Sequence, residues 1–509
     1  MTHAFAASPF ATYNDVQAHL DGLGMFHMDL GLGRMERVLD ALGLAAPPFT
    51  VAQVVGTNGK GSTSTFLAAI GTAHGLRTGL YTSPHFVTPR ERIRIDGAML
   101  AADLWPGLAN RVMAAGGDAL TYFEFLTVLG LLAFREAGVQ LAVLEAGLGG
   151  AHDATTAVAA DVVCVTPIGL DHQAVLGPTI AAIAADKAGA LRPGVPAVTA
   201  PQPGEAMDEL RTAADACGAP LREADDVAKL PARAELGLAG PHQRTNALVA
   251  LAAWTTLAKA NEWESHEDAV RQGLAEAWIP GRLQWVERPA AEPYGAGGPG
   301  SANGADGTGG TDGAGAPKAP APPETPGMPA LPARLVIDGA HNAHGLAALR
   351  AALADQCARP AVVIFSCLAD KDLVAVAEEV RRLAGDAPVL VPTIRDNARA
   401  ARGEDLAVLL GPAARPVPDM ATALAEATAL APQGPVLLCG SLYLLGEFFT
   451  LRPDCLESRG AGDSCEVDDT SLDGTPHVSP AVSPGASPDT RPDAQADDAP
   501  KTPPGPQHP

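Results

Sequence analysis

The sequence has no uninterrupted apolar run of about 18 residues, the length that a membrane-spanning helix needs. Its first residues, MTHAFAASPF, also lack the basic start and apolar stretch of a secretory signal. These two absences predict a cytoplasmic protein that has no membrane partner.

Cysteine pairs and basic residues are also scarce. The seven cysteines are scattered, and no two are spaced as C-x-x-C, so the sequence indicates neither a disulfide framework nor a zinc site. There are 35 Lys and Arg against 58 Asp and Glu, which gives a formal charge of -23. A chain this acidic is not expected to bind nucleic acid, because that binding needs Lys and Arg to replace phosphate counterions.

Apolar residues make up 47% of the 509 residues, enough for more than one core, because single cores stop growing at roughly 250–300 residues. Short apolar runs such as TVAQVVG, LAVLEAG and DVVCVTPIG alternate with longer Ala/Leu-rich segments. This alternation predicts βα units and a mainly parallel sheet in an α/β fold. A second series, PAVVIFSC, PVLVPTI and PVLLCGS, predicts a smaller, Rossmann-like α/β domain.

Two segments interrupt this regularity. Residues 289–332 are mostly Ala, Gly, Pro, Ser and Thr, and residues 453–509 carry eleven acidic residues against three basic ones. Neither composition can bury enough apolar surface to offset the entropy lost on ordering. We therefore expect a disordered insertion and a disordered acidic tail, with a first folded domain at 1–284 and a second at 285–450.

The strongest local pattern is GTNGKGS, which follows an apolar strand and precedes a helix expected to begin near Lys60. Its glycines let backbone N–H groups approach a polyphosphate at the positive end of the helix. Lys60 adds a charge for the β and γ phosphates, and Ser62 or Thr63 supplies a hydroxyl for Mg²⁺. A glycine-rich turn without a ligand is the alternative, which the flanking strand and helix disfavour. The predicted ATP-binding residues of this loop are Gly56, Thr57, Asn58, Gly59, Lys60, Gly61 and Ser62.

This short loop is similar to the phosphate loop of the Mur ligase superfamily. The segments MDLGL, YTSPHF, TYFEFLT, LEAGLGG, GLDHQ, DKAGA and DGAHN resemble, in the same order, those of the folate ligases in that superfamily. Over most of residues 15–450 the chain thus resembles the dihydrofolate synthase/folylpolyglutamate synthase family. Only 55 residues precede Gly56, so we expect no UDP-binding domain of the kind that peptidoglycan ligases carry.

The resemblance implies ATP-dependent ligation of L-glutamate to dihydropteroate, to folates or to both, through an acyl phosphate. It implies that the first domain, 1–284, is a Mur-ligase-type ATP-binding domain and that the second, 285–450, is the glutamate-ligase domain. It also implies a monomer that uses Mg²⁺, with two ions expected. One alternative is another superfamily ligase that acts on a different carboxylate. The other is a nucleotide-binding protein without catalysis, which the presence of second-metal ligands disfavours.

Carried over by position, the resemblance assigns three further groups of residues. The expected metal ligands are Ser62, Ser83, Glu145 and His172, and the expected catalytic residues are Lys60, His172 and Lys187. Lys187 matches a lysine that the superfamily carbamylates, which requires a neutral amine and hence a lowered pKa. Further ATP contacts are expected from Asn246, Arg282, Asp338 and His341. Taken without the family, the residues favour a strand-end surface acid at Glu145 and a loop residue at His172, and an ordinary helix-surface lysine stays an open alternative for Lys187.

For the pterin substrate the resemblance implies binding by two kinds of side chain. Aromatic rings can pack on a flat ring system, and carboxylates can accept hydrogen bonds from its amino groups. The aromatics Tyr122 and Phe123 can equally be core residues of a helix, the commoner situation. The expected substrate residues are Asp29, Leu30, Gly31, Thr121, Tyr122, Phe123, Glu124, His152 and Asp153.

Overall fold

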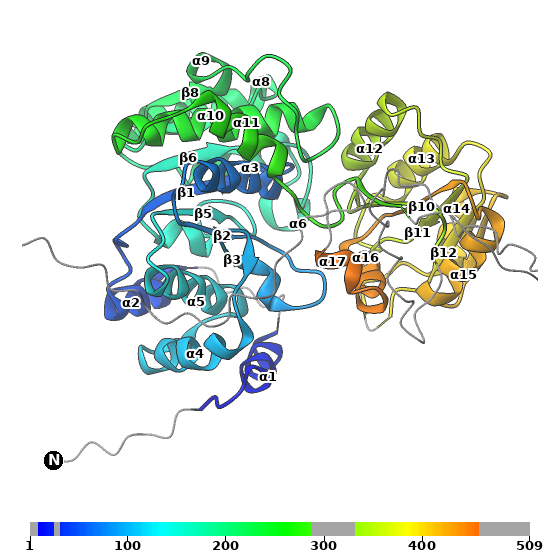
Figure 1. Ribbon diagram of the computed structural model, residues 1–509, viewed down its shortest axis with the longest axis horizontal. Coiled ribbons are helices and arrows are strands. Elements are labelled where there is room, and N and C mark those ends of the chain that lie inside the picture. The colour runs from blue at the N-terminus through cyan, green and yellow to red at the C-terminus, as the bar shows by residue number, and fades with distance from the viewer. Residues whose placement is uncertain (1–8, 25–30, 288–330, 396, 458–509) are drawn as a thin grey trace, which may run out of the picture. The chain divides into compact units, whose positions relative to one another are not determined.

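The computed structural model describes residues 9–24, 31–287, 331–395 and 397–457. Two β-sheets, each with helices on both faces, organise these residues (Figure 1). The predicted α/β fold with two mainly parallel sheets is confirmed. In the part of the chain so described, no helix has the length and apolar character needed to cross a membrane.

The first sheet has eight strands in the order β4-β3-β2-β5-β1-β6-β7-β8. All neighbouring pairs are parallel except β2–β3 and β3–β4, which are antiparallel at one edge. The strands are β1 (Thr50–Val55), β2 (Thr78–Tyr81), β3 (Ile93–Ile95), β4 (Ala98–Met99), β5 (Leu141–Glu145), β6 (Val162–Val165), β7 (Ala197–Thr199) and β8 (Leu221–Glu223).

The side chains of strand β1 contribute to hydrophobic cores on both faces of this sheet. Ala52 and Val54 pack on one face, and Val51 and Val55 pack on the other, because successive side chains of a strand point to opposite sides. The first face is covered by α3 (Lys60–Ala73), α10 (His242–Ala260) and α11 (Glu267–Glu276). The second is covered by α1 (Tyr13–Leu23), α2 (Gly33–Leu42), α4 (Trp105–Ala114), α5 (Tyr122–Glu136), α7 (Ile180–Ala188) and α8 (Gly204–Cys217).

Short helical segments lie between these elements. They are η1 (Pro89–Arg92), η2 (Ala102–Leu104), η3 (Gly117–Ala119), η4 (Ala154–Ala157), α6 (Gln173–Leu176) and α9 (Ala224–Val227).

The second sheet has six strands in the order β13-β12-β11-β14-β10-β9, and only β9 is antiparallel to its neighbour. Its strands are β9 (Gln284–Glu287), β10 (Arg334–Asp338), β11 (Val362–Phe365), β12 (Val389–Pro392), β13 (Ala414–Val417) and β14 (Pro435–Cys439). One face is covered by α12 (Ala343–Asp355), α13 (Leu373–Ala384) and α14 (Gly403–Leu410). The other is covered by α15 (Met420–Leu430) and α16 (Leu442–Leu451).

The expected insertion and tail lie largely outside the described residues, but the folded part reaches further than the composition indicated. Leu331 is only 4% exposed and packs in the second core. After Pro453 the chain forms α17 (Asp454–Glu457), where Cys455 and Leu456 are buried in that same core. The insertion and tail boundaries were therefore wrong at Leu331 and at Pro453, because these apolar side chains find places in an existing core.

The strands on either side of the insertion are neighbours. Arg334 of β10 lies opposite Glu287 of β9, and its Nε is 3.6 Å from the Glu287 carboxylate. Closing even a long loop costs little more than closing a short one, about 0.6 kcal/mol per doubling of its length. The pairing brings Arg282 and Asp338, far apart in sequence, to the same end of the sheet.

Candidate active site

The glycine-rich loop joins β1 to α3, and two of its glycines have no room for a side chain. Gly56 has φ 144° and Gly59 has φ 87°. A Cβ atom at Gly56 would lie 1.9 Å from Thr166 Oγ1, and one at Gly59 would lie 2.2 Å from Asn246 Oδ1. The loop can therefore pass close to β6 and α10 only because these residues are glycine.

The N-terminus of α3 supplies the free donors of this loop. The first helical hydrogen bond runs from Thr63 N to Gly59 O, so the amides of Lys60, Gly61 and Ser62 have no partner within the helix. The amides of Thr57 and Asn58, in contrast, donate to the carbonyl of Pro167. The structure thus makes residues 60–62, rather than 57–58, the donors suited to phosphate.

We expect Gly59→Ala to unfold more readily than wild type and to lose most of its stabilisation by ADP. The substitution strains the backbone by about 1–2 kcal/mol and also displaces Asn246. Thermal unfolding with and without ADP measures both effects. Gly75→Ala is the matched control, since Gly75 has φ 80° but nothing within 4 Å of a Cβ. Equal shifts in the two variants would show that crowding at Asn246 does not matter.

Glu145 ends β5 beside this loop and is 5% exposed. Its Oε2 accepts a hydrogen bond from Ser83 N at 2.9 Å, the one hydrogen bond of this carboxylate among the described residues. Burial raises its pKa, and the positive charge of Lys60 opposes that rise. A Cβ at Gly61 would lie 3.4 Å from Oε1, so the carboxylate faces the first turn of α3. Oε1 is thus an oxygen donor open to a cation there.

Lys187, on α7, is 3% exposed. Burial, and after it the charge of Lys60, lower its pKa to about 7 against the opposing carboxylates of Asp186 and Asp153. An ordinary surface lysine does not behave this way. A substantial fraction of neutral amine is therefore present near pH 7.

His172 lies in the turn before α6, with φ 51°, and its side chain is half exposed. Burial lowers its pKa, while Asp171 opposes the shift. Asp171 is held by Lys371, whose Nζ is 3.0 Å from Asp171 Oδ1. Burial raises the pKa of Asp171, but the charges of His172 and Lys371 outweigh burial and lower this pKa to about 2. Asp171 therefore stays ionised beside His172.

Arg282, Asp338 and His341 gather where β10 ends. The Asp338 carboxylate accepts from Leu283 N and Ala340 N, each at 2.8 Å, so it fixes the backbone on both sides of the insertion. Burial raises the pKa of Asp338, and Arg282 opposes the rise. Burial lowers the pKa of His341 to about 4, so its ring is neutral at pH 7. Asn246 lies apart from them on α10, against Gly59.

The residues expected to bind the pterin differ in their structural surroundings. Asp29 and Leu30 lie outside the described residues, and Gly31 has φ 119°. Thr121 and Glu124 form the capping box of α5, and Glu124 Oε2 also accepts from Arg34 Nε at 2.8 Å.

Of the other four residues expected to bind the pterin, two are buried and two are at least partly exposed. Tyr122 is 2% exposed and belongs to the core, whereas Phe123 is only partly buried and its ring lies against Gly147. His152 is exposed. Asp153 is buried and accepts hydrogen bonds from Gly147 N, Leu148 N and Thr155. Its bonds hold a loop, a role that sequence alone did not indicate.

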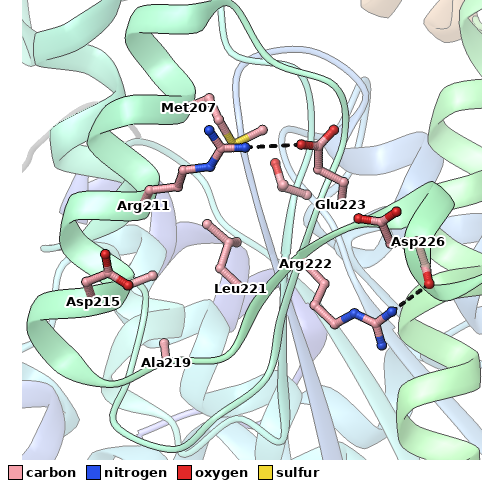
Figure 2. Close-up of a pocket in the computed structure, with 10 residues that line it drawn as sticks. Met207, Arg211, Asp215, Ala219, Leu221, Arg222, Glu223 and Asp226 are labelled. Carbon is pink, nitrogen blue, oxygen red and sulfur yellow. Dashed lines mark hydrogen bonds and ion pairs between the residues drawn. The ribbon is translucent and has the colours of Figure 1, made fainter.

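One small cavity brings several predicted residues together. It is lined by Gly56, Thr57, Lys60, Gly147, Leu148, Gly149, Asp171, His172, Leu176 and Lys187. A larger cavity of about 290 Å³ lies between α8, β8 and α9, where Arg211 bonds Glu223 at 3.4 Å (Figure 2). The larger cavity contains none of the predicted site residues. We take the smaller one as the candidate active site, because it brings Lys60, His172 and Lys187 to the glycine loop.

Known proteins share this architecture. Residues 329–442 match the family model of the Mur ligase glutamate ligase domain. A curated Bacillus subtilis protein, dihydrofolate synthase/folylpolyglutamate synthase, is 34% identical over 307 residues, which are 55% of this chain and 71% of that protein. The chain belongs to the dihydrofolate synthase/folylpolyglutamate synthase family. The chain covers only 44% of a curated folylpolyglutamate synthase from Arabidopsis thaliana and 50% of a probable bifunctional folylpolyglutamate synthase/dihydropteroate synthase from Haloferax volcanii.

Solved structures of the family superpose over nearly their whole length. E. coli FolC, in complex with DHPP and ADP, has a TM-score of 0.71 at 28% identity and covers 88% of this chain and 99% of its own. A bifunctional family enzyme with Mn, AMPPNP and L-glutamate bound has a TM-score of 0.71 at 29% identity, with the same two coverages. The family consists of ligases that form C–N bonds.

Lys371 was not predicted from the sequence. It precedes α13, 200 residues from Asp171, and its side chain is 15% exposed. The only available signal was an isolated lysine among acids in the segment ADKDL. Such a signal does not specify its partner.

Proposed function

We propose that this chain uses ATP to join L-glutamate to the carboxylate of dihydropteroate and to the γ-carboxylate of folates. The observation that carries the proposal is the cavity shared by Lys60, His172 and Lys187 at the N-terminus of α3. It combines a polyphosphate site, with the charge of Lys60, with His172 and Lys187, whose side chains could hold a cation beside an anionic acceptor. A carboxylate is a poor acyl donor at neutral pH, which is why activation by ATP is needed.

In the first step a substrate carboxylate oxygen attacks the γ-phosphorus of ATP, and ADP leaves. Lys60 and the amides of residues 60–62 hold the phosphates and offset the charge on the transferring group. In the second step the amine of glutamate attacks the carbonyl carbon of the acyl phosphate. Inorganic phosphate then leaves with the oxygen that made the first attack. No side-chain nucleophile is needed, so the chain acts by positioning and electrostatics.

A divalent cation fits beside Glu145, whose Oε1 faces the start of α3. Ser83 N donates to Glu145 Oε2, and Ser62 follows Gly61 in the turn of α3 that Oε1 faces. The two hydroxyls and the carboxylate would supply the oxygen donors that Mg²⁺ prefers. When bound, the ion would neutralise charge on the β and γ phosphates. Glu145 then acts by holding that charge close to Lys60.

A second cation, near His172, requires Lys187 to change its charge. An ammonium group would repel the ion, but the carbamate formed by a neutral amine and CO₂ is an anion with two oxygens. The pKa of about 7 at Lys187 favours that reaction near neutral pH. Carbamylated Lys187 and His172 would then form the second site.

A substrate panel tests the proposal. Phosphate release from ATP should require Mg²⁺ and glutamate together with dihydropteroate or tetrahydrofolate, and a UDP-muramyl substrate should not support it. Release with both pterins indicates a bifunctional enzyme. Turnover with the muramyl substrate alone would instead favour a ligase for another carboxylate.

A further inference from the structure

Gln53 is a polar residue in the middle of a central, otherwise apolar strand. It is fully buried, between Leu144 of β5 and Val163 of β6. Strands covered on both faces are normally apolar throughout, and a buried amide must be hydrogen-bonded to be tolerated. The proposed chemistry does not use this side chain, so its presence there needs another reason.

Hydrogen bonds fix the orientation of the Gln53 amide. Its Oε1 accepts from Arg192 Nη2 at 3.2 Å. Its Nε2 donates to Thr155 Oγ1 at 2.9 Å and to Thr156 Oγ1 at 2.7 Å. Because a guanidinium can only donate, Oε1 must face Arg192 and the NH₂ group must face the two threonines.

The hydroxyls of Thr155 and Thr156, which accept hydrogen bonds from Gln53, each donate their own hydrogen to the next acceptor in the network. Thr155 Oγ1 donates to Asp153 Oδ1 at 2.6 Å, and Thr156 Oγ1 donates to Gly150 O at 2.7 Å. Asp153 Oδ2 accepts from Gly147 N at 2.8 Å and from Leu148 N at 3.0 Å. Each hydroxyl has a single hydrogen and uses it here, so the network has one consistent arrangement of protons.

The network ends on the glycine segment Gly147–Gly150, whose first three residues line the cavity with Lys60 and Lys187. The segment also packs tightly on α7. A Cβ atom at Gly150 would lie 2.5 Å from the carbonyl oxygen of Lys187. Ala151 N donates to Asp186 O at 3.0 Å. Arg192, which follows α7, also donates to Thr156 O at 2.8 Å.

We propose that Gln53, Arg192 and Thr156 are positioning residues that hold the segment Gly147–Gly150 in register with Lys60 and Lys187 for phosphoryl transfer. This inference rests on the proposed function for the step that it serves. The three residues link the strand that enters the phosphate loop to the helix that carries Lys187. Misplacing reacting groups by about 1 Å can cost a hundredfold in rate. None of the hydrogen bonds described for this network involves residues 60–62 at the N-terminus of α3, so the affinity for ATP should change little.

The experiment compares Thr156→Val, which removes the hydroxyl at nearly constant shape, with Thr156→Ser, which keeps it. We expect Thr156→Val to lower kcat tenfold to a hundredfold, with KM for ATP changed less than twofold, and Thr156→Ser to behave like wild type. Gln53→Glu is the second variant, because a carboxylate still accepts from Arg192 but cannot donate to the threonines. It should lower kcat in the same way.

Amide hydrogen exchange over residues 147–153 gives a readout that does not depend on the reaction. Exchange there should be faster in Thr156→Val than in Thr156→Ser. Equal kcat and equal exchange in the two variants would overturn the proposal, as would a lowered melting temperature with kcat per folded enzyme unchanged. If wild type shows no pterin-dependent turnover, the proposed function fails, while exchange still decides whether the network holds the segment.

Discussion

Lys60→Ala should lower kcat about a thousandfold while leaving the protein folded. Lys60 begins α3 and lines the cavity, and in the proposed reaction its charge offsets that of the transferring phosphate. Removing one preorganised group of this kind costs about 10²–10³ in rate. Phosphate release under saturating ATP measures the loss, and thermal unfolding checks the fold.

Lys229→Ala is the matched control for Lys60→Ala. Its side chain is 78% exposed and, among the residues that the structure describes, forms only a surface ion pair at 4.0 Å with Asp225. Such pairs contribute little, so its kcat should equal that of wild type. A Lys60→Ala enzyme that keeps more than a tenth of wild-type kcat would contradict the placement of the phosphate site.

Lys187→Met should lower kcat about a hundredfold and, in CO₂-free buffer, raise the free energy of unfolding. The lysine pKa falls from 10.5 to about 7 on folding, so the folded state binds fewer protons than the unfolded state between these values. Burying this lysine therefore destabilises the fold, and the penalty grows as pH falls from about 10.5 to about 7. The stability gain of Lys187→Met should accordingly be larger at pH 6 than at pH 9. Urea unfolding at the two pH values measures it.

Carbon dioxide separates the proposed carbamate from a lysine that acts as an amine. Wild-type activity should fall when CO₂ is removed and return when bicarbonate is added, and ¹³CO₂ should give a carbamate signal in NMR. Lys187→Met should respond to neither treatment. Wild-type activity that is unaffected by CO₂, with no carbamate signal, would show that Lys187 works uncarbamylated.

Local chemistry made the phosphate loop predictable. The helix begins at Lys60, as the sequence indicated, because the glycines, the helix and the preceding strand are all encoded within a few residues. The parallel sheets were predictable for the same reason, since alternating apolar runs and helical segments lie consecutively along the chain. The antiparallel strands β3, β4 and β9 were not, because their short sequences carry little pattern of their own.

Contacts between distant residues could not be obtained from the sequence. Nothing near Asp171 indicates that Lys371 will reach it, and nothing near Gln53 indicates that Thr155 and Thr156 will accept its hydrogens. Burial is also a tertiary property. The lowered pKa of Lys187 depends on how α7 packs, and Tyr122 and Phe123 are adjacent in sequence yet differ in exposure. The family resemblance predicted many site residues. Only the fold shows that the carboxylates of Asp153 and Asp338 accept hydrogen bonds from backbone amides and so hold loops in place.

The most direct test of the proposed chemistry follows an oxygen atom. Dihydropteroate labelled with ¹⁸O in both carboxylate oxygens is incubated with ATP, Mg²⁺ and glutamate, and the released phosphate is analysed by mass spectrometry. If the carboxylate attacks ATP and the glutamate amine then displaces phosphate, each phosphate must carry one ¹⁸O. Phosphate without ¹⁸O, formed in step with the ligated product, would contradict the acyl-phosphate route.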